Sequence, residues 1–261
     1  MRPLSARNPR VQRLGRLARR RGERVEQRAL LVEGPVLVGT ALDAGAEVLE
    51  LYVDEAALAD PEVTALVQRL DEMADVWMLP PGVLDRVGDA ATSQGVAAVV
   101  QWDDGRWPTP DRVPFVLVLA DVADPGNAGT LIRTAVAAGV GAVVVAGGVD
   151  PTSPKVVRSS AGALFSVDVV RADSAAEAAS RLADDGYLTV GTVVDGADAY
   201  DTVDLTGPVA VVLGNEAHGL ASEVAADLGH LVTIPMAGPT ESLNVAMAGT
   251  VVCFEVLRQR R

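Results

Sequence analysis

The first hundred residues combine one helical pattern of apolar side chains with several short apolar runs. Val11, Leu14, Leu17 and Ala18 recur at helical spacing with arginines between them, which predicts a basic amphipathic helix over Pro9–Arg21. The later runs predict strands that alternate with helices, and so a small α/β unit. The strands are expected at Ala29–Glu33, Val48–Val53, Val76–Leu79 and Val96–Gln101, and the helices at Pro35–Ala44 and Glu62–Met73.

The second half of the chain alternates strands and helices more regularly. Its strand runs are continuous and rich in valine, which is typical of a parallel sheet buried on both faces. This alternation predicts a doubly wound α/β fold. The strands are expected at Phe115–Ala120, Ala142–Ala146, Val167–Val170, Leu188–Val193, Val209–Leu213 and Leu231–Ile234. The helices are expected at Asn127–Ala138, Lys155–Ala163, Ala175–Ala183, Ala221–Leu228 and Leu243–Arg258.

A stretch rich in proline, glycine and charge separates the two halves. Residues 103–111 read Asp-Asp-Gly-Arg-Trp-Pro-Thr-Pro-Asp, which is typical of a linker. We therefore predict an N-terminal α/β domain over residues 1–102, a linker over 103–112 and a C-terminal domain over 113–261.

The composition, with 49% hydrophobic and 22% charged residues, excludes wholesale disorder. The single cysteine, Cys253, cannot form an intrachain disulfide and favours a reducing compartment. The chain has only two histidines besides this cysteine, so we expect no metal site. No apolar stretch reaches the roughly 20 residues that span a bilayer, and the start lacks the apolar core of a signal peptide. We expect no membrane partner and a cytoplasmic location.

The net charge of −13 is unevenly distributed. Residues 1–28 hold ten arginines and two glutamates, a net charge of +8, whereas the remainder carries −21. A basic segment on an acidic body is a local electrostatic footprint for a polyanion. A solvated helix face is the alternative interpretation of the same arginines.

Three compact groups of glycine and polar residues follow predicted strands. Ligands of doubly wound sheets bind beyond the carboxyl ends of the strands, so these groups are the candidate site. Neither of the glycine-rich phosphate-binding motifs is present, which gives no support to a dinucleotide or nucleoside-triphosphate site. The groups are Asp124–Ala135, Leu213–Leu220, and Ile234–Met236 with Glu241–Ala246.

Taken together, these groups resemble the signature motifs of the SpoU/TrmH family of the SPOUT superfamily. The resemblance rests on Asn127-x-Gly129-x-x-x-Arg133, then Gly214-Asn215-Glu216-x-x-Gly219-Leu220, then Ile234-Pro235-Met236 with Ser242-Leu243-Asn244-Val245-Ala246. It implies an S-adenosylmethionine-dependent RNA ribose 2′-O-methyltransferase with a deep trefoil knot between about residue 209 and the last helix. Residues 8–101 are more loosely similar to the family's RNA-binding domain, which is related to kink-turn-binding ribosomal proteins.

The resemblance also implies residue roles. Gly191, Gly214, Ile234 and Leu243 would contact the cofactor; taken singly, they also fit an ordinary core and ordinary turns. The resemblance implies that Arg133 helps to remove the proton of the reacting hydroxyl. Because a guanidinium is almost always protonated, a literal base would need a desolvated site; the alternative is that Arg133 places a phosphate and stabilises the forming alkoxide.

The remaining candidates are polar residues of the same motifs and arginines outside them. Asn127 could be a helix cap alone, Glu216 a solvated carboxylate and Ser242 a cap. The assigned catalytic residues are Arg133, Asn127, Glu216, Ser242 and Asn244. The assigned RNA-binding residues are Arg158, Arg13, Arg16, Arg20 and Arg24.

The expected substrate is structured RNA, with large-subunit ribosomal RNA as first choice and transfer RNA as the alternative. A non-catalytic RNA-binding or ribosome-assembly protein and a small-molecule methyltransferase are hypotheses from other classes. The resemblance implies a homodimer through the C-terminal domain. The last helix offers a face of small residues for it, namely Val245, Ala246, Ala248 and Val252.

Overall fold

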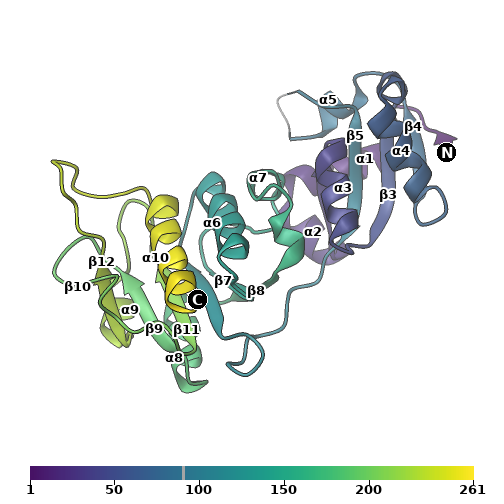
Figure 1. Ribbon diagram of the computed structural model, residues 1–261. Helices are drawn as coiled ribbons and strands as arrows, with labels where there is room; N and C mark the ends of the chain where they lie inside the picture. The colour runs from purple at the N-terminus through teal and green to yellow at the C-terminus, as the bar shows by residue number, and fades with distance from the viewer. Residues whose placement is uncertain (90–91) are drawn as a thin grey trace. The chain divides into compact units, whose positions relative to one another are not determined.

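The computed structural model describes residues 1–89 and 92–261, which form two compact units. The first unit contains Met1–Asp103 together with Thr152–Phe165, and the second contains Asp104–Pro151 and Ser166–Arg261 (Figure 1). This division differs from the expected one, because helix α7 (Pro154–Ser159) packs on strand β2 of the first unit. Gly162 contributes to this packing, since a side chain there would press against Thr40.

The first unit is a five-stranded mixed sheet with helices around it. Its strand order is β1-β4-β3-β5-β2, in which β5 runs antiparallel to both of its neighbours. The strands are β1 (Arg2–Pro3), β2 (Ala29–Glu33), β3 (Val48–Asp54), β4 (Asp75–Leu79) and β5 (Val96–Gln101). The helices are α1 (Pro9–Arg19), α2 (Arg21–Gln27), α3 (Pro35–Asp43), α4 (Pro61–Leu70) and α5 (Val83–Val87), with a 3-10 turn at Glu55–Ala59.

The apolar stripe predicted for the first helix is the one that packs on this sheet. The four predicted side chains of α1 are at most 5% exposed and join one core cluster with Tyr52 and Trp77. The helix ends earlier than expected: Arg20 has an extended backbone with φ −121°, and α2 starts afresh after it. The basic segment is therefore two helices with an exposed corner between them.

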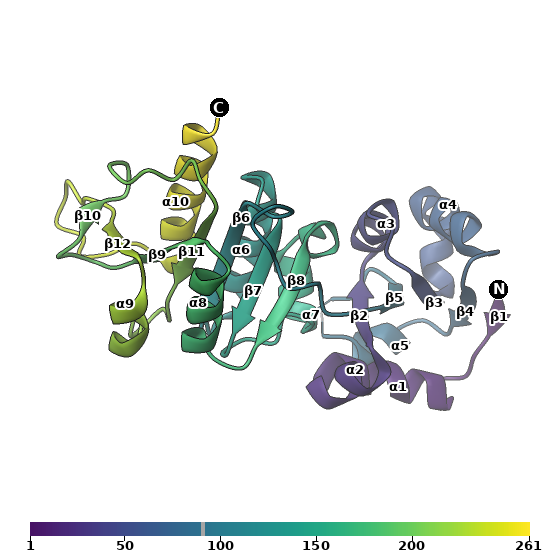
Figure 2. The same ribbon diagram turned by 90° about the horizontal axis from the view of Figure 1, so that it is seen from below.

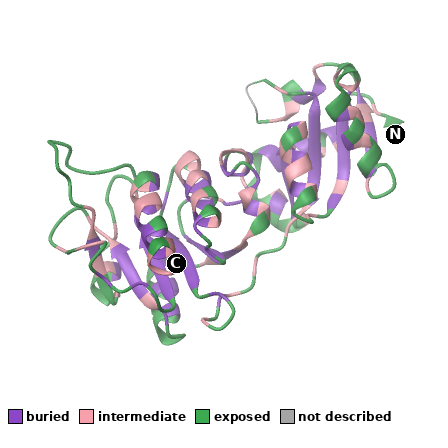
Figure 3. Cartoon of the chain, in the orientation of Figure 1, coloured by how far each residue is buried: buried purple, intermediate pink, exposed green. Residues whose placement is uncertain are grey.

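The second unit is a seven-stranded sheet in which every pairing is parallel. Its order is β10-β12-β9-β11-β6-β7-β8. The strands are β6 (Phe115–Ala120), β7 (Ala142–Ala146), β8 (Asp168–Ala172), β9 (Leu188–Thr192), β10 (Asp198–Ala199), β11 (Val209–Leu213) and β12 (His230–Thr233). The central strands are buried throughout (Figure 3), as their continuous apolar runs require.

Helices cover both faces of this sheet (Figure 2). Alternate strand residues such as Val116, Val118 and Val212 share a core cluster with α8 (Ala175–Asp184) and α9 (Ser222–Asp227). The residues between them face α6 (Pro125–Ala137) and α10 (Val245–Gln259). Gly249 of α10 lets that helix approach closely, because a side chain there would overlap Leu131 and Leu213.

Several helix ends differ from the expected ones. The helix expected at Lys155–Ala163 ends at Ser159 and is followed by a 3-10 turn over Ala163–Ser166. The last helix begins at Val245, two residues later than expected. Within residues 1–89 and 92–261, none of the helices combines the length and the apolar character needed to cross a membrane.

The segment predicted as a linker is fastened to the second unit. The Gly105 backbone N–H donates to the Val169 carbonyl at 2.8 Å, so the segment lies along the edge strand β8. Trp107 Nε1 donates to Asp185 Oδ2 at 2.8 Å, and the guanidinium of Arg181 lies 4.0 Å from the centre of its ring. Covering an edge strand in this way protects its unpaired backbone groups.

Candidate active site

A cavity of about 390 Å³ opens beyond the carboxyl ends of three parallel strands in the second unit. Its walls are Thr192–Val194 at the end of β9, Gly214–Leu220 after β11, and Ile234 and Met236 after β12, with Ser242 and Leu243 before α10. The site thus lies where the fold class predicts, near the point where the strand order changes direction between β6 and β11.

The loop after β11 forms one wall and is closed by its own hydrogen bonds. The backbone groups of Asn215 and Gly219 pair in both directions, at 3.0 and 2.8 Å. Gly214 precedes this closed loop, and a side chain there would overlap the backbone of Gly219. The wall is tied to the end of β6, because Asn215 Nδ2 donates to the Asp121 carbonyl at 2.9 Å.

The three motif groups meet in a chain of hydrogen bonds beside this cavity. Asn244 Nδ2 donates to Asn127 Oδ1 at 3.1 Å, and Asn127 Nδ2 donates to Glu216 Oε1 at 3.0 Å. The two carboxylate oxygens of Glu216 also accept the backbone N–H groups of Ala123 and Asp124, each at 3.0 Å. Residues as far apart in sequence as 127 and 244 are therefore joined at one place.

The charge state of Glu216 decides which group donates and which accepts in each hydrogen bond of this network. Partial burial alone would raise the pKa of its carboxyl, but the hydrogen bonds from Asn127 and from the Ala123 and Asp124 backbone outweigh it and lower the pKa below the ordinary value. An ionised carboxylate only accepts hydrogen bonds, so Asn127 must present its amide nitrogen to it. The Asn127 oxygen is then left to accept from Asn244.

Both helices at this site begin with a side-chain cap. Asp124 Oδ1 accepts the Asn127 backbone N–H at 3.0 Å, so Asp124 caps α6 and the alternative of Asn127 as a mere cap is wrong. Asn244 Oδ1 accepts the Ala246 N–H at 2.9 Å and caps α10. Asn244 thus caps α10 through its amide oxygen and binds Asn127 through its amide nitrogen.

Some of the other catalytic and cofactor candidates line the cavity, and others do not. Gly214, Ile234, Ser242 and Leu243 line the cavity, and Leu243 is 38% exposed. Gly191 lies in the buried strand β9, where a side chain would overlap the packed Leu228, and it is not among the lining residues. Arg133 is exposed on α6 and makes no hydrogen bond or ion pair with the described part of the chain.

Three of the four arginines expected to hold RNA along the basic segment are engaged within the first unit. Arg24 is 5% exposed and donates to the carbonyls of Leu17 and Ala18. Arg13 Nη1 pairs with the buried Glu50 at 2.7 Å, and Arg16 pairs with Glu23 at 2.9 Å. The prediction for Arg24 as a phosphate ligand is wrong, because burial withholds its guanidinium from solvent.

Exposed arginines remain at the corner between the two helices. Arg20 and Arg21 are exposed, as is Arg7 just before α1, and none of the three side chains pairs with residues 1–89 or 92–261. Among the described residues, Arg20 is thus the one expected phosphate ligand of this segment that is exposed and has no partner.

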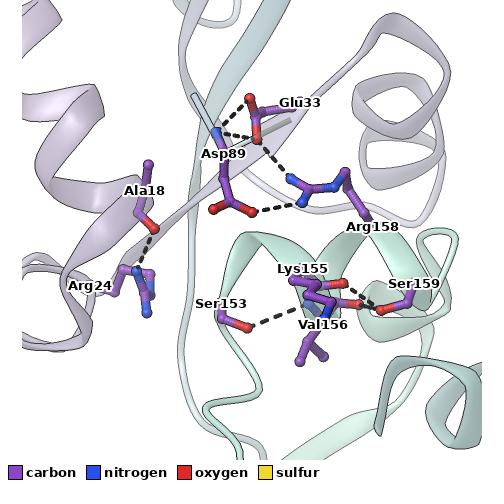
Figure 4. A network of polar contacts seen from close by, with 9 residues as sticks. All are labelled: Ala18, Arg24, Glu33, Asp89, Ser153, Lys155, Val156, Arg158 and Ser159. Atoms are coloured by element: carbon purple, nitrogen blue, oxygen red, sulfur yellow. Dashed lines mark hydrogen bonds and ion pairs between the residues drawn. The ribbon is translucent and has the colours of Figure 1, made fainter. Parts of the chain in front are cut away.

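Arg158 lies on α7 and is also paired (Figure 4). Its Nη1 donates to Glu33 Oε2 at 3.0 Å and its Nη2 to Asp89 Oδ2 at 2.7 Å. Two carboxylates therefore balance its charge and occupy both ends of the guanidinium. This arrangement fits a clamp between α7 and the rest of the first unit better than the expected contact with RNA phosphate.

Some contributors to the site were missed by sequence reasoning. His218 lines the cavity beside Glu216, and Met236 lines it from the loop after β12. Asn215 builds the wall through its side-chain bonds to Asp121 and to the N–H groups of Ala217 and His218. All three residues lie inside the candidate groups Leu213–Leu220 and Ile234–Met236, but the sequence analysis assigned none of them a role.

Comparison with known proteins gives two family matches. Residues 114–254 match the SpoU rRNA methylase family, and residues 8–98 match an MRM3-like substrate-binding domain. A protein of Mycobacterium sp. (strain KMS) described as an uncharacterized tRNA/rRNA methyltransferase is 36% identical over 252 residues, which cover 93% of this chain and 80% of that protein.

Solved structures agree with these matches. An RNA 2′-O ribose methyltransferase is 34% identical with a TM-score of 0.83, over 100% of this chain and 99% of that one. An rRNA methyltransferase of Sinorhizobium meliloti with bound AdoMet is 31% identical with a TM-score of 0.84, over 98% and 97%. A structure concerned with 2-OH methylation of C/U34 on tRNA is 31% identical with a TM-score of 0.51, over 56% of this chain and 89% of that one. The chain therefore belongs to the SpoU family of RNA methyltransferases.

Proposed function

We propose that this protein transfers a methyl group from S-adenosylmethionine to a ribose 2′-hydroxyl of large-subunit ribosomal RNA. The observation that carries the proposal is the series of hydrogen bonds from Asn244 through Asn127 to Glu216. These bonds bring all three motifs together beside a ligand-sized cavity. Sites for small molecules and cofactors span roughly 300–1,000 Å³, so this cavity is of a suitable size.

The residues of the cavity fit the cofactor chemically. S-adenosylmethionine supplies an activated methyl group on a sulfonium cation. The described lining contains Glu216 and Glu241 but neither lysine nor arginine, which suits a cationic ligand. Gly214, Ile234 and Leu243 give it backbone groups and apolar packing, and Gly191 supports the wall from behind rather than touching the ligand.

The polar network positions the substrate. Asn127, Asn244 and Glu216 hold the starts of α6 and α10 in fixed register, and Ser242 presents a hydroxyl at the rim of the cavity. Exposed Arg133, on α6, holds a phosphate or stabilises the forming alkoxide. Holding the reacting atoms in line accounts for much of the rate that such a site can supply.

Ribosomal RNA is favoured over transfer RNA by the extent of the structural matches. The rRNA enzyme matches 98% of this chain, both units included, whereas the structure concerned with tRNA matches 56% of it. We propose further that the path from β11 to α10 is knotted as in the SPOUT superfamily, that the first unit binds structured RNA like a kink-turn-binding module, and that the protein works in the cytoplasm.

We propose a homodimer through the second unit, on a face other than the one expected. Ala246 and Val252, two of the small residues expected to make the dimer, are buried within the chain. The outer face of α10 instead carries Met247 and Phe254, which are 49% and 44% exposed and lie seven residues apart on one side of the helix. An exposed apolar stripe of this kind marks an interaction site.

Transfer of a labelled methyl group tests the function. The purified protein would be incubated with labelled S-adenosylmethionine and total RNA from cells that lack it, and the RNA would be fractionated and digested to nucleosides. We expect label in a 2′-O-methyl nucleoside of the large-subunit fraction, and a strong loss with Arg133→Ala. Label in the tRNA fraction supports the alternative substrate, and RNA binding without label supports a non-catalytic protein.

A further inference from the structure

The connection between β6 and α6 places the start of the helix that carries Asn127 and Arg133. It covers residues 121–124, which are not part of the described lining of the cavity. If the proposed function holds, the loop after β11, Gly214–Leu220, holds the cofactor while the polar groups of α6 act on the ribose. This loop, named the cofactor loop below, and the start of α6 must then keep a fixed relation, because small misplacements of reacting groups lower the rate strongly.

The connection has an uncommon backbone conformation at its first residue. Asp121 has a φ of +57°, in the left-handed region that few residues other than glycine adopt. A residue in this region persists where its surroundings hold it, and such residues cluster at functional sites. The end of β7 holds one side of the connection, since the Asp121 N–H donates to the Ala146 carbonyl at 3.0 Å. The Val149 N–H, after β7, donates to the Val122 carbonyl at 2.9 Å.

Asn215 binds the connection from the cofactor loop. Its Nδ2 donates to the Asp121 carbonyl at 2.9 Å. Its Oδ1 accepts the backbone N–H groups of Ala217 and His218, at 2.9 and 3.2 Å, and so supports the closed form of the cofactor loop. The two ends of one amide therefore differ in what they do. The oxygen shapes the loop that lines the cavity, and the nitrogen fastens that loop to the connection before α6.

We propose that Asn215 is a positioning residue for methyl transfer. Through its hydrogen bond to Asp121, the amide nitrogen keeps the start of α6 in register with the cofactor loop. The ribose-directed groups of α6, Asn127 and Arg133, are thereby held in place relative to the bound cofactor. Asn215 acts through this bond and not through contact with the reacting atoms.

Glu216 holds the same connection in a different way. Its carboxylate accepts the backbone N–H groups of Ala123 and Asp124, each at 3.0 Å. An ionised carboxylate cannot donate, whereas the Asp121 carbonyl needs a donor. Asn215 supplies that donor, so the two neighbouring side chains have separate tasks on one connection.

Two substitutions remove the donor of Asn215 and keep an acceptor for the loop. Asn215→Asp and Asn215→Ser both retain an oxygen that accepts backbone N–H groups a few residues on, the serine more weakly. Neither side chain can donate to the Asp121 carbonyl, because the carboxylate has no proton and the serine side chain is too short. One variant adds a negative charge and the other adds none, so an effect that both share comes from the lost hydrogen bond.

The first measurement is the rate of methyl transfer at saturating S-adenosylmethionine and RNA, with the full-length protein. We expect kcat to fall about 10- to 100-fold in both variants. Calorimetry should show an S-adenosylmethionine affinity of Asn215→Ser close to that of wild type. Asn8→Asp and Asn8→Ser are the matched controls, because Asn8 caps α1 in the first unit by accepting the Arg10 N–H at 2.9 Å. Both controls should keep the wild-type rate.

A second readout does not depend on turnover. Hydrogen exchange of individual backbone amides, followed by NMR, reports which hydrogen bonds open locally. In both Asn215 variants the amides of Ala123 and Asp124 should exchange faster than in wild type. The amides of Ala217 and His218 should keep their wild-type exchange, because the loop retains its acceptor. A purely structural role of Asn215 in folding the loop would speed the exchange of all four.

The outcomes separate this role from the proposed function. A wild-type kcat in both variants overturns the positioning role alone. So does a loss confined to S-adenosylmethionine affinity, which would make Asn215 only a part of the cofactor wall, or equally faster exchange of all four amides. If one variant fails to fold, the other carries both measurements. A wild-type protein that methylates no RNA overturns the proposed function, and the role of Asn215 in methyl transfer with it.

Discussion

The direction of each hydrogen bond around Glu216 decides what this site can tolerate. The carboxylate accepts from one amide side chain and from two backbone N–H groups, so every partner is a donor. Replacing it with an isosteric group that also donates would place a hydrogen-bond donor opposite another donor. The site is therefore sensitive to substitutions that keep the size and shape of a side chain but change its hydrogen-bonding groups.

Glu216→Gln tests this dependence. One oxygen of Glu216 becomes an amide nitrogen that faces a donor, so the starts of α6 and α10 lose their fixed register. We expect the rate of methyl transfer to fall about 100-fold, since small misplacements of reacting groups cost that much. The rate is measured at saturating S-adenosylmethionine, because removing one of the two carboxylates of the cavity also weakens the binding of a cationic cofactor.

The same variant also changes how stability depends on pH. The pKa of Glu216 is lowered on folding, so its contribution to stability is present above its unfolded-state pKa and is lost as the pH falls through its folded-state pKa. The melting temperatures of wild type and Glu216→Gln should therefore differ near pH 6 and converge as the pH approaches about 3. A constant difference would contradict the assignment of the ionised carboxylate.

At the scale of elements, apolar periodicity predicts six of the seven strands of the second sheet to within two residues at each end. Their runs are long and buried on both faces, so local sequence and tertiary packing agree. Short elements such as β1, α5 and β10 were missed, because two to five residues carry too little periodicity. The motif groups pointed to the site, but hydrogen-bond directions depend on contacts over about a hundred residues, which no local pattern encodes.

The basic segment also shows that local sequence does not reveal which partners a side chain meets. Spacing predicted its amphipathic helix and buried stripe, but the partners of each arginine depend on carboxylates elsewhere in the chain. Arg13 meets Glu50 of β3, and Arg24 is covered by the fold of its own unit. Counting ten arginines therefore overstates the charge that is free to meet a polyanion.

The double variant Arg20→Ala with Arg21→Ala tests which arginines bind RNA. These exposed side chains have no partner among the described residues, so their loss should weaken RNA binding at unchanged stability. The slope of log K against log salt should flatten by about 0.7 to 0.9 for each lost phosphate contact. Fluorescence anisotropy across a salt series measures both quantities.

Arg24→Ala is the matched comparison for this pair. Removing the buried guanidinium leaves the carbonyls of Leu17 and Ala18 without its hydrogen bonds. We expect a loss of about 1–3 kcal/mol in the free energy of unfolding, with the salt slope of RNA binding retained. An unchanged slope in the Arg20 and Arg21 variant would show that the corner is merely solvated.

Leu243→Arg tests the segment before α10 as a cofactor wall. Leu243 lines the cavity and is partly exposed, so a charged side chain can be accommodated by the fold but not by an apolar contact with a ligand. Desolvating the charge costs several kcal/mol, which corresponds to a loss of at least about 100-fold in S-adenosylmethionine affinity. RNA binding should persist.

Calorimetry with S-adenosylmethionine checks this expectation. Met73→Arg, at a residue of the first unit that is 67% exposed, is the control for adding a charge in place of an exposed apolar side chain. Equal cofactor affinity in wild type and Leu243→Arg would contradict the placement of the cofactor in this cavity.

For the whole molecule, the outer face of α10 is the clearest candidate contact between two copies. Met247→Glu with Phe254→Glu places charge on the exposed stripe without touching the buried side of the helix. We expect a dimer of the wild type at micromolar concentration and a folded monomer of the double variant, measured by sedimentation. A wild-type monomer that retains activity would contradict the dimer.

The division of labour between the two units follows from where the chemistry lies. The network and the cavity belong to the second unit, while the exposed arginines at the α1–α2 corner belong to the first. Segment 152–165 belongs to the first unit although its neighbours in sequence belong to the second, so the chain passes between the units three times. A test of function should therefore use the full chain.

Mapping of ribose methylation in cellular RNA tests the central claim most directly. Total RNA would be compared between cells with the protein, cells without it, and cells that carry only Leu243→Arg. We predict one or a few 2′-O-methyl positions in large-subunit ribosomal RNA that are present with the wild type and absent in the other two. Identical methylation maps in all three would contradict the account.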